Sequence, residues 1–198
     1  MIMKFTNGLP ETACGAGSRV SYTTELRRWI TRLMEELKVN KLVDAPCGDF
    51  NWMAHTDLSS VDYVGLDFDY DHLVAAGRQS VPITYSPRSK MLLQFDLVTG
   101  TLPRADMILC REFLQHLPNA LALAVLQNFV SSGTRWLLTT SHNNLNNRDL
   151  VKAGGFRPLN LMQPPFSFPS PVRSVEDARG SGRILGLWSL KYVAQSAA

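Results

Sequence analysis

Two short apolar runs, each ending in an acidic residue, constrain the fold of this chain more than any other feature. Residues 42–49 read Leu-Val-Asp-Ala-Pro-Cys-Gly-Asp, and the run Tyr-Val-Gly-Leu-Asp ends at Asp67. In an open α/β sheet this pattern places one carboxylate at the end of each of two strands, beside a turn where backbone can approach a ligand. Asp44 and Asp67 therefore predict a nucleoside site at the edge of a parallel sheet.

The rest of the chain alternates short apolar segments with helical ones. Strands are predicted at 41–45, 61–67, 91–95, 105–110 and 135–140, and helices at 23–38, 49–58, 69–79 and 118–130. Strands of this kind, separated by helices, are typical of a parallel sheet that is covered on both faces. Two more strands, 156–161 and 184–192, are expected to form an antiparallel hairpin joined by a long loop.

The predicted fold class is therefore α/β, with a doubly wound, mostly parallel seven-stranded sheet, an antiparallel C-terminal hairpin and helices on both faces. The 198 residues suit a single domain, 1–198, and show no internal repeat. Residues 1–21 contain a glycine-rich stretch and are expected to form a flexible loop or lid. Residues 161–182 are expected to form a loop on the substrate side. Its Pro- and Phe-rich part, 163–171, could form a wall over the acceptor pocket or a stiff edge connection.

Composition and charge exclude several classes of protein. The formal net charge of +3 permits an anionic partner but does not by itself indicate nucleic acid. No apolar run is long enough to span a membrane, and the N-terminus has no signal-peptide core, so a cytoplasmic protein is expected. The three cysteines lack Cys-x-x-Cys spacing, so neither a metal site nor a disulfide framework is predicted.

The turn after the first acidic strand is informative because it has fewer glycines than a dinucleotide-binding turn. A dinucleotide site needs Gly-x-Gly-x-x-Gly so that a helix N-terminus can receive a pyrophosphate. Here Pro46 takes the first glycine position and Asp49 adds negative charge beside the turn. A cationic or zwitterionic nucleoside is favoured instead, with the ribose hydroxyls on Asp67.

These segments together resemble the class I S-adenosylmethionine-dependent methyltransferases. Residues 42–49 are similar to the first motif of that family, and 63–67 to the second. Phe95-Asp96 resembles the segment that meets the adenine, and 105–118 resembles the fourth strand with the helix that follows. The resemblance covers roughly residues 22–192 and implies S-adenosylmethionine as cofactor and S-adenosylhomocysteine as product.

The resemblance also implies roles for individual residues. Asp44 and the Gly48 backbone would face the methionine part, Asp67 would hold the ribose, and Asp96 would accept from the adenine amino group with Leu97 against the ring. Cys110 and Arg111 would line the floor near the methyl group. The complete set expected to contact the cofactor is Asp44, Pro46, Cys47, Gly48, Trp52, Asp67, Phe68, Asp96, Leu97, Cys110 and Arg111.

Candidate catalytic groups follow the fourth and fifth strands. His116 and His142 are imidazoles that could act as general base, since imidazole titrates near neutral pH. Glu112 is the carboxylate alternative, and Arg111 could bind an acidic substrate or pair with an acid. His116 could equally be structural, while His55 and His72 are expected on the surface.

The leading hypothesis for function is methyl transfer to a small molecule, at a metabolite or sugar-type hydroxyl. A second hypothesis keeps the cofactor and changes the acceptor to RNA or protein, although arginine clustering is weak and a nucleic-acid partner is not favoured. A third is a non-catalytic binding protein that retains the fold. The sequence leaves the acceptor and the oligomeric state open.

Overall fold

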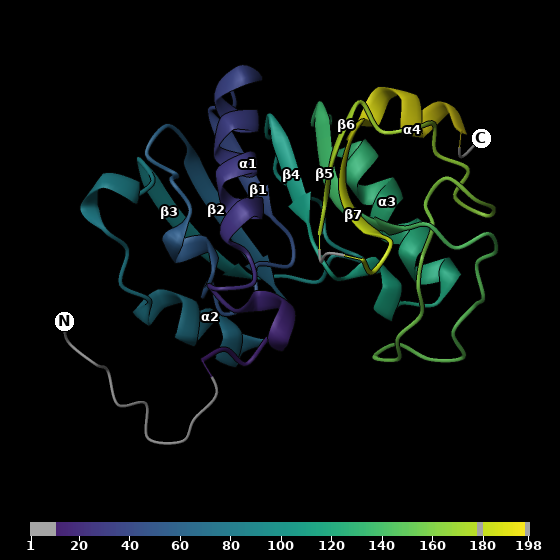
Figure 1. Cartoon of the computed structure of the whole chain (residues 1–198), viewed down its shortest axis with the longest axis horizontal. Helices are drawn as coiled ribbons and strands as arrows, with labels where there is room; N and C mark the ends of the chain where they lie inside the picture. Colours follow the sequence, from purple (N-terminus) through teal and green to yellow (C-terminus); the bar gives the residue numbers. More distant parts are fainter. Residues whose placement is uncertain (1–10, 178–179, 197–198) are drawn as a thin grey trace.

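The computed structural model describes residues 11–177 and 180–196 and contains a seven-stranded sheet of order β3-β2-β1-β4-β5-β7-β6 (Figure 1). The strands are β1 Lys41–Asp44, β2 Asp62–Asp67, β3 Ser89–Gln94, β4 Met107–Cys110, β5 Trp136–His142, β6 Arg173–Glu176 and β7 Arg183–Ser189. The first five pair in parallel, whereas β7 pairs antiparallel to both β5 and β6. The predicted fold class is confirmed.

Helices cover the two faces of this sheet. The α-helices are α1 Thr24–Glu36, α2 Tyr70–Arg78, α3 Asn119–Ser131 and α4 Leu190–Ser196, and short 3-10 turns are η1 Ala16–Ser18, η2 Met53–His55, η3 Ile83–Tyr85 and η4 Leu114–His116. Figure 1 shows α1 and α2 beside β1–β3, with α3 and α4 beside β5–β7.

Alternating side chains of the strands build two separate cores. Leu42 and Met107 pack with buried residues of α1 and α2, whereas Val43 and Ile108 pack with α3 and α4. Because successive strand residues point to opposite faces, strands that are apolar throughout can serve both cores. This explains why the strands read as continuous apolar runs.

The register aligns the carboxyl ends of the central strands. Asp44 lies opposite Gly65 of β2 and Leu109 of β4, and Asp67 lies opposite Gln94 of β3. The strand order reverses between β1 and β4, which is where ligands bind in open α/β sheets. The fold thus opens a crevice beside Asp44.

Two predicted elements are wrong, and a third is too long at its C-terminal end. Residues 49–58 form turns and η2 rather than a helix, since Phe50 has a φ of 59° and interrupts helical geometry. Residues 156–161 are not a strand, and the hairpin instead uses β6 with β7. The predicted strand 184–192 ends at Ser189 and continues as α4, whose Leu190 and Val193 are buried at helical spacing.

Candidate functional site

A cavity of about 570 Å³ opens at the carboxyl ends of β1, β2 and β4. This volume is within the range of small-molecule sites. Its lining residues are Cys14, Ser18, Asp44, Pro46, Cys47, Gly48, Asp49, Trp52, Asp67, Phe68, His72, Phe95, Asp96, Leu97, Val98, Arg111, Glu112, Phe113, Leu117, Leu121 and Ala153.

Gly48 lies in the turn after β1, where the backbone closely approaches Cys14. Its φ is +55°, and a Cβ added there would lie 2.6 Å from the Cys14 sulfur. Glycine is the residue that tolerates both the left-handed backbone and this close approach. The Gly48 N–H donates to Asp67 Oδ2 at 2.8 Å, so the turn after β1 is tied to the end of β2.

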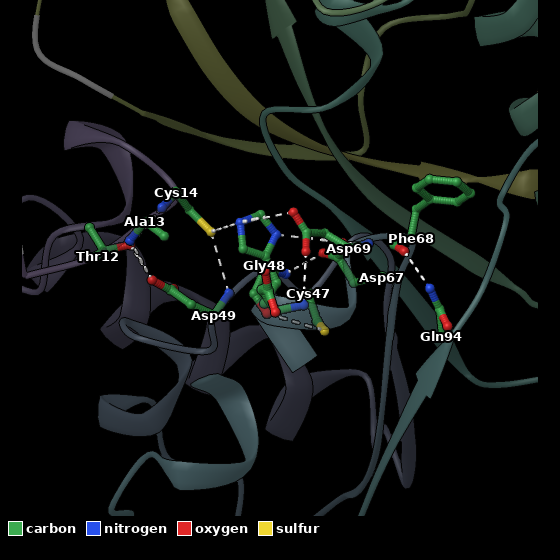
Figure 2. A network of polar contacts seen from close by, with 12 residues as sticks. Thr12, Ala13, Cys14, Cys47, Gly48, Asp49, Asp67, Phe68, Asp69 and Gln94 are labelled. Atoms are coloured by element: carbon green, nitrogen blue, oxygen red, sulfur yellow. Dashed lines mark hydrogen bonds and ion pairs between the residues drawn. The ribbon is translucent and has the colours of Figure 1, made fainter. Parts of the chain in front are cut away.

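Asp67 is almost completely buried and is held by several donors. Besides Gly48, the Asp69 N–H donates to Oδ1 at 2.9 Å, and His72 Nδ1 lies 3.6 Å from Oδ1. Figure 2 shows the hydrogen bond between Gly48 and Asp67, with Asp69 close by. These contacts fix the orientation of its carboxylate, which is what a group that binds ribose hydroxyls requires.

Asp44 lies deeper and has fewer partners. It is 3% exposed, and the Tyr63 hydroxyl donates to Oδ2 at 2.7 Å. Burial, and to a smaller extent the nearby charge of Asp67, raises the pKa of Asp44 to about 7. A nearby cation would stabilise the ionised form, so this carboxyl is suited to bind a positively charged group.

Asp49 anchors the N-terminal segment instead of only adding charge to the turn. Its Oδ2 accepts from the Thr12 hydroxyl at 2.6 Å and from the Ala13 N–H at 2.8 Å. The Asp49 N–H in turn donates to the Cys14 sulfur at 3.3 Å, as Figure 2 shows. Residues 12–14 therefore pack against the turn after β1, and Cys14 forms part of the cavity wall.

The opposite end of the cavity is more apolar and more open. Phe68 is 73% exposed at its edge, while Leu97 is buried within it. Asp96 is exposed and accepts from the Val98 N–H at 2.8 Å and the Thr99 hydroxyl at 2.9 Å. These two hydrogen bonds, the backbone one first, lower the pKa of Asp96. This end suits a flat heterocycle beside a carboxylate.

A buried charge network borders the cavity beyond β4. Arg111 donates from Nε and Nη2 to the two carboxylate oxygens of Asp177, both at 2.9 Å. Arg183 of β7 donates to Glu112 Oε2 at 2.8 Å and to the Asp177 carbonyl at 2.6 Å. The C-terminal hairpin therefore neutralises Arg111 and positions Glu112.

Glu112 combines several features that are typical of functional sites. Its φ of 57° is unusual for a residue with a side chain, and its N–H is held by the Thr140 hydroxyl at 2.9 Å. Burial raises its pKa, whereas Arg183 and Arg111 lower it, and burial is the largest effect. Its Oε1 atom is secluded and has no hydrogen-bond partner.

Comparison with solved structures finds this fold in several methyltransferases. The methyltransferase domain of bacterial CtHen1 superimposes with a TM-score of 0.60 at 16% identity, covering 85% of this chain and 99% of that one. The N-methyltransferase NodS from Bradyrhizobium japonicum WM9 gives a TM-score of 0.58 at 14% identity, covering 85% and 96%. The chain has the class I methyltransferase fold.

Other methyltransferase structures match over a shorter length. Magnesium protoporphyrin IX methyltransferase from Synechocystis PCC 6803, with S-adenosylhomocysteine bound, gives a TM-score of 0.52 at 14% identity. That match covers 63% of this chain, which spans only 58% of the Synechocystis protein. No protein-family model matches the sequence, and neither does any curated protein. The methyltransferase fold alone does not specify an acceptor.

The structure brings most of the predicted cofactor-contacting residues together in the methyltransferase fold. Of that set, all but Cys110 line the cavity. Cys110 is completely buried within β4, and burial raises its thiol pKa. Trp52 lies beside Arg111, whose guanidinium carbon is 5.3 Å from the ring centroid. Whether these residues contact a cofactor stays a prediction.

The two predicted histidine bases lie elsewhere, and neither is among the residues that line the cavity. His116 Nδ1 lies 2.6 Å from the Gly155 carbonyl oxygen, so the ring donates from this nitrogen. His142 Nδ1 accepts from the Leu159 N–H at 3.1 Å, and burial lowers its pKa. Both imidazoles hold the segment that follows β5.

His72 is a cavity residue that sequence reasoning missed. It was expected on the surface, yet it lines the cavity, with Nε2 3.9 Å from the Cys14 sulfur. The available signal was its place in the first turn of α2, directly after the acidic end of β2. In the described part of the chain, no cluster of His, Cys, Asp and Glu is arranged to hold a metal ion.

Proposed function

We propose that this chain is an S-adenosylmethionine-dependent methyltransferase that acts on a small molecule, at a hydroxyl group. The observation that carries the proposal is the set of carboxylates at the cavity, which includes Asp44, Asp67, Asp96 and Glu112. The cavity guanidinium, Arg111, is already neutralised by Asp177. An acidic cavity at this sheet edge favours a nucleoside that carries positive charge.

The residues present fit such a cofactor on structural grounds. Gly48, which has no side chain, lets Cys14 pack closely against the turn beside the cavity, and Asp67 is fixed in orientation next to it. Asp44 can hold an ammonium or sulfonium charge, which would stabilise its ionised form. Phe68 and Leu97 offer apolar surface for the adenine beside Asp96. When bound, S-adenosylmethionine supplies a methyl group activated by the adjacent sulfonium.

The protein must then align the acceptor oxygen in line with that methyl group and remove the hydroxyl proton. We assign proton removal to Glu112, because it lines the cavity and has one carboxylate oxygen without a partner. Its raised pKa makes it a better base than an ordinary glutamate. Arg183 fixes the other oxygen and so positions the carboxylate.

Titration calorimetry of the purified chain with S-adenosylmethionine and S-adenosylhomocysteine tests the cofactor assignment. Loss of the Asp67 carboxylate in Asp67→Ala should weaken affinity by roughly 10- to 100-fold, because a charged hydrogen bond contributes about 1.5–3 kcal/mol. Asp62→Ala is the matched control, since Asp62 begins the same strand and lies away from the cavity. No binding heat with either compound at millimolar concentration would refute the proposal.

Transfer of a tritiated methyl group into a cell extract tests the role of Glu112. Glu112→Gln should slow labelling by about 10²–10⁴-fold, as expected for loss of a general base, and leave S-adenosylhomocysteine binding intact. Glu36→Gln on the exposed side of α1 controls for loss of a surface charge. Labelling at the wild-type rate in Glu112→Gln would refute Glu112 as the general base.

A further inference from the structure

A turn that contributes one residue, Ala153, to the wall of the cavity exposes apolar side chains. This segment, residues 148–156, lies between β5 and β6, in the green connection at the lower right of Figure 1. Val151 is completely exposed and Phe156 is 60% exposed. Single exposed apolar residues are common on proteins, so their meaning depends on how the turn is held and what lies beside it.

The backbone of this turn is fixed by several contacts. The Gly154 N–H donates to the His116 carbonyl at 2.9 Å, and His116 Nδ1 bonds the Gly155 carbonyl at 2.6 Å. The Phe156 ring lies 5.8 Å from the His116 ring and 6.2 Å from the His142 ring. Phe156 is therefore held in its exposed position by ordered neighbours.

The turn is continuous with the cavity. Ala153, between Val151 and Phe156, is one of the cavity-lining residues. The apolar side chains of Phe113, Leu117 and Leu121 line the cavity as well. Ala153 thus links the wall of the cavity to the turn that carries Val151 and Phe156.

The same turn carries two exposed cations. Within the described residues, the side chains of Arg148 and Lys152 are exposed and form no hydrogen bond or ion pair. Asp149 lies between them, but its Oδ1 accepts from the backbone N–H groups of Asn119 and Leu150, both at 2.7 Å. The turn therefore offers apolar area with unpaired positive charge beside it.

We propose that residues 148–156 bind the body of the methyl acceptor, and that this acceptor is an amphipathic small molecule with an apolar body and an acidic group. The apolar body packs on Val151 and Phe156, and the acidic group pairs with Arg148 or Lys152. The methylated hydroxyl then enters the cavity past Ala153. This inference rests on the proposed function for the site but concerns a different surface.

The dye 1-anilinonaphthalene-8-sulfonate tests the surface directly, since it combines an aromatic body with an anionic group. Titrations use the folded chain with saturating S-adenosylhomocysteine, so that the cofactor part of the cavity is occupied. Wild-type protein should bind the dye saturably. Val151→Ser/Phe156→Ser should weaken binding by about tenfold, which corresponds to about 1.4 kcal/mol of lost apolar contact.

Two further variants sharpen the dye experiment. Ile83→Ser is the matched control, because Ile83 is equally apolar and 93% exposed but lies in η3. It should bind the dye like wild type. Arg148→Gln/Lys152→Gln should bind more weakly and lose the salt dependence of binding. Equal dye affinity in wild type and Val151→Ser/Phe156→Ser would overturn the proposal.

Methyl labelling identifies the acceptor class independently of the dye. After incubation with tritiated S-adenosylmethionine and a cell extract, label should partition into the organic phase on acidification, and Val151→Ser/Phe156→Ser should reduce it. Label only in the aqueous phase or in precipitated RNA or protein would overturn the inference but leave the proposed function standing. Absence of cofactor binding would refute the proposed function while the dye result remains informative about the turn.

The alternative role for this surface is self-association of the chain. Sedimentation of wild type and Val151→Ser/Phe156→Ser over a range of concentrations measures it. A dimer that dissociates in the double variant would assign the turn to a second copy of the chain and overturn the acceptor proposal. Equal masses at all concentrations support it.

Discussion

Asp44 and Asp67 end neighbouring strands, yet their surroundings give them different properties. Asp67 accepts hydrogen bonds from two backbone N–H groups, whereas Asp44 has one Tyr63 hydroxyl and is more deeply buried. Backbone donors stabilise a carboxylate, and burial with few donors favours the neutral acid. A bound cation would therefore favour the charged form of Asp44.

The raised pKa of Asp44 predicts how stability depends on pH. The folded protein binds a proton that the unfolded chain has lost, so stability falls as pH rises from about 4 to about 7. Asp44→Asn mimics the protonated form and should be more stable than wild type at pH 8, by up to about 4 kcal/mol, but not at pH 4. Urea unfolding of the cofactor-free proteins at both pH values measures this.

Asp96→Asn should change stability in the opposite direction from Asp44→Asn. The pKa of Asp96 is lowered by hydrogen bonds, so its ionised form stabilises the fold above pH 4 and the amide should lose that contribution. If the difference in free energy of unfolding between Asp44→Asn and wild type is the same at every pH, the result would contradict a buried, partly protonated Asp44.

At the scale of elements, the C-terminal hairpin is attached to the cavity by charges. Arg111 follows β4, and Asp177 follows β6, and both side chains are less than 5% exposed. Removing one partner of a buried ion pair leaves an uncompensated charge, which is far more costly than losing an exposed pair. The pair therefore couples the position of the hairpin to the floor of the cavity.

Asp177→Asn should lower the free energy of unfolding by about 3–5 kcal/mol, because the Arg111 guanidinium stays buried without its anion. The exposed pair of Arg88 and Asp62 is the control, and Asp62→Asn should cost less than about 1 kcal/mol. Denaturant unfolding measures both. If the double variant Arg111→Met/Asp177→Leu recovers the lost free energy of unfolding, the loss in Asp177→Asn arises from the unpaired charge. If Asp177→Asn and Asp62→Asn lower the free energy of unfolding by similar small amounts, the result would contradict a buried pair.

At the scale of the whole molecule, the cavity lies where two halves of the sheet and the N-terminal segment meet. Residues 12–14, the ends of β1 and β2, and the hairpin all contribute contacts around it. A ligand in the cavity would contact all of these parts only when the chain is folded. Binding should therefore stabilise the whole domain rather than one loop.

Saturating S-adenosylhomocysteine should raise the melting temperature. At 100 times the dissociation constant the gain is about 2.7 kcal/mol, which corresponds to roughly 5–10 °C for a domain of this size. Scanning calorimetry measures the shift, and adenosine alone should give a smaller one. An unchanged melting temperature at saturating ligand would contradict binding to the folded state.

The sequence by itself determined that the sheet is mostly parallel and that Asp44, Asp67 and Asp96 come at or just after the ends of strands. It could do so because apolar segments that alternate with helices, and acidic residues that follow such segments, are local patterns. It did not reveal that residues 49–58 form turns. Local helix propensity reports neither the left-handed backbone conformation of Phe50 nor the hydrogen bond from Thr12 to Asp49. The bond between Arg111 and Asp177 and the place of His72 in the cavity were likewise decided only by the tertiary structure. These contacts join residues far apart in the chain, and their geometry exists only once the sheet has brought the segments together.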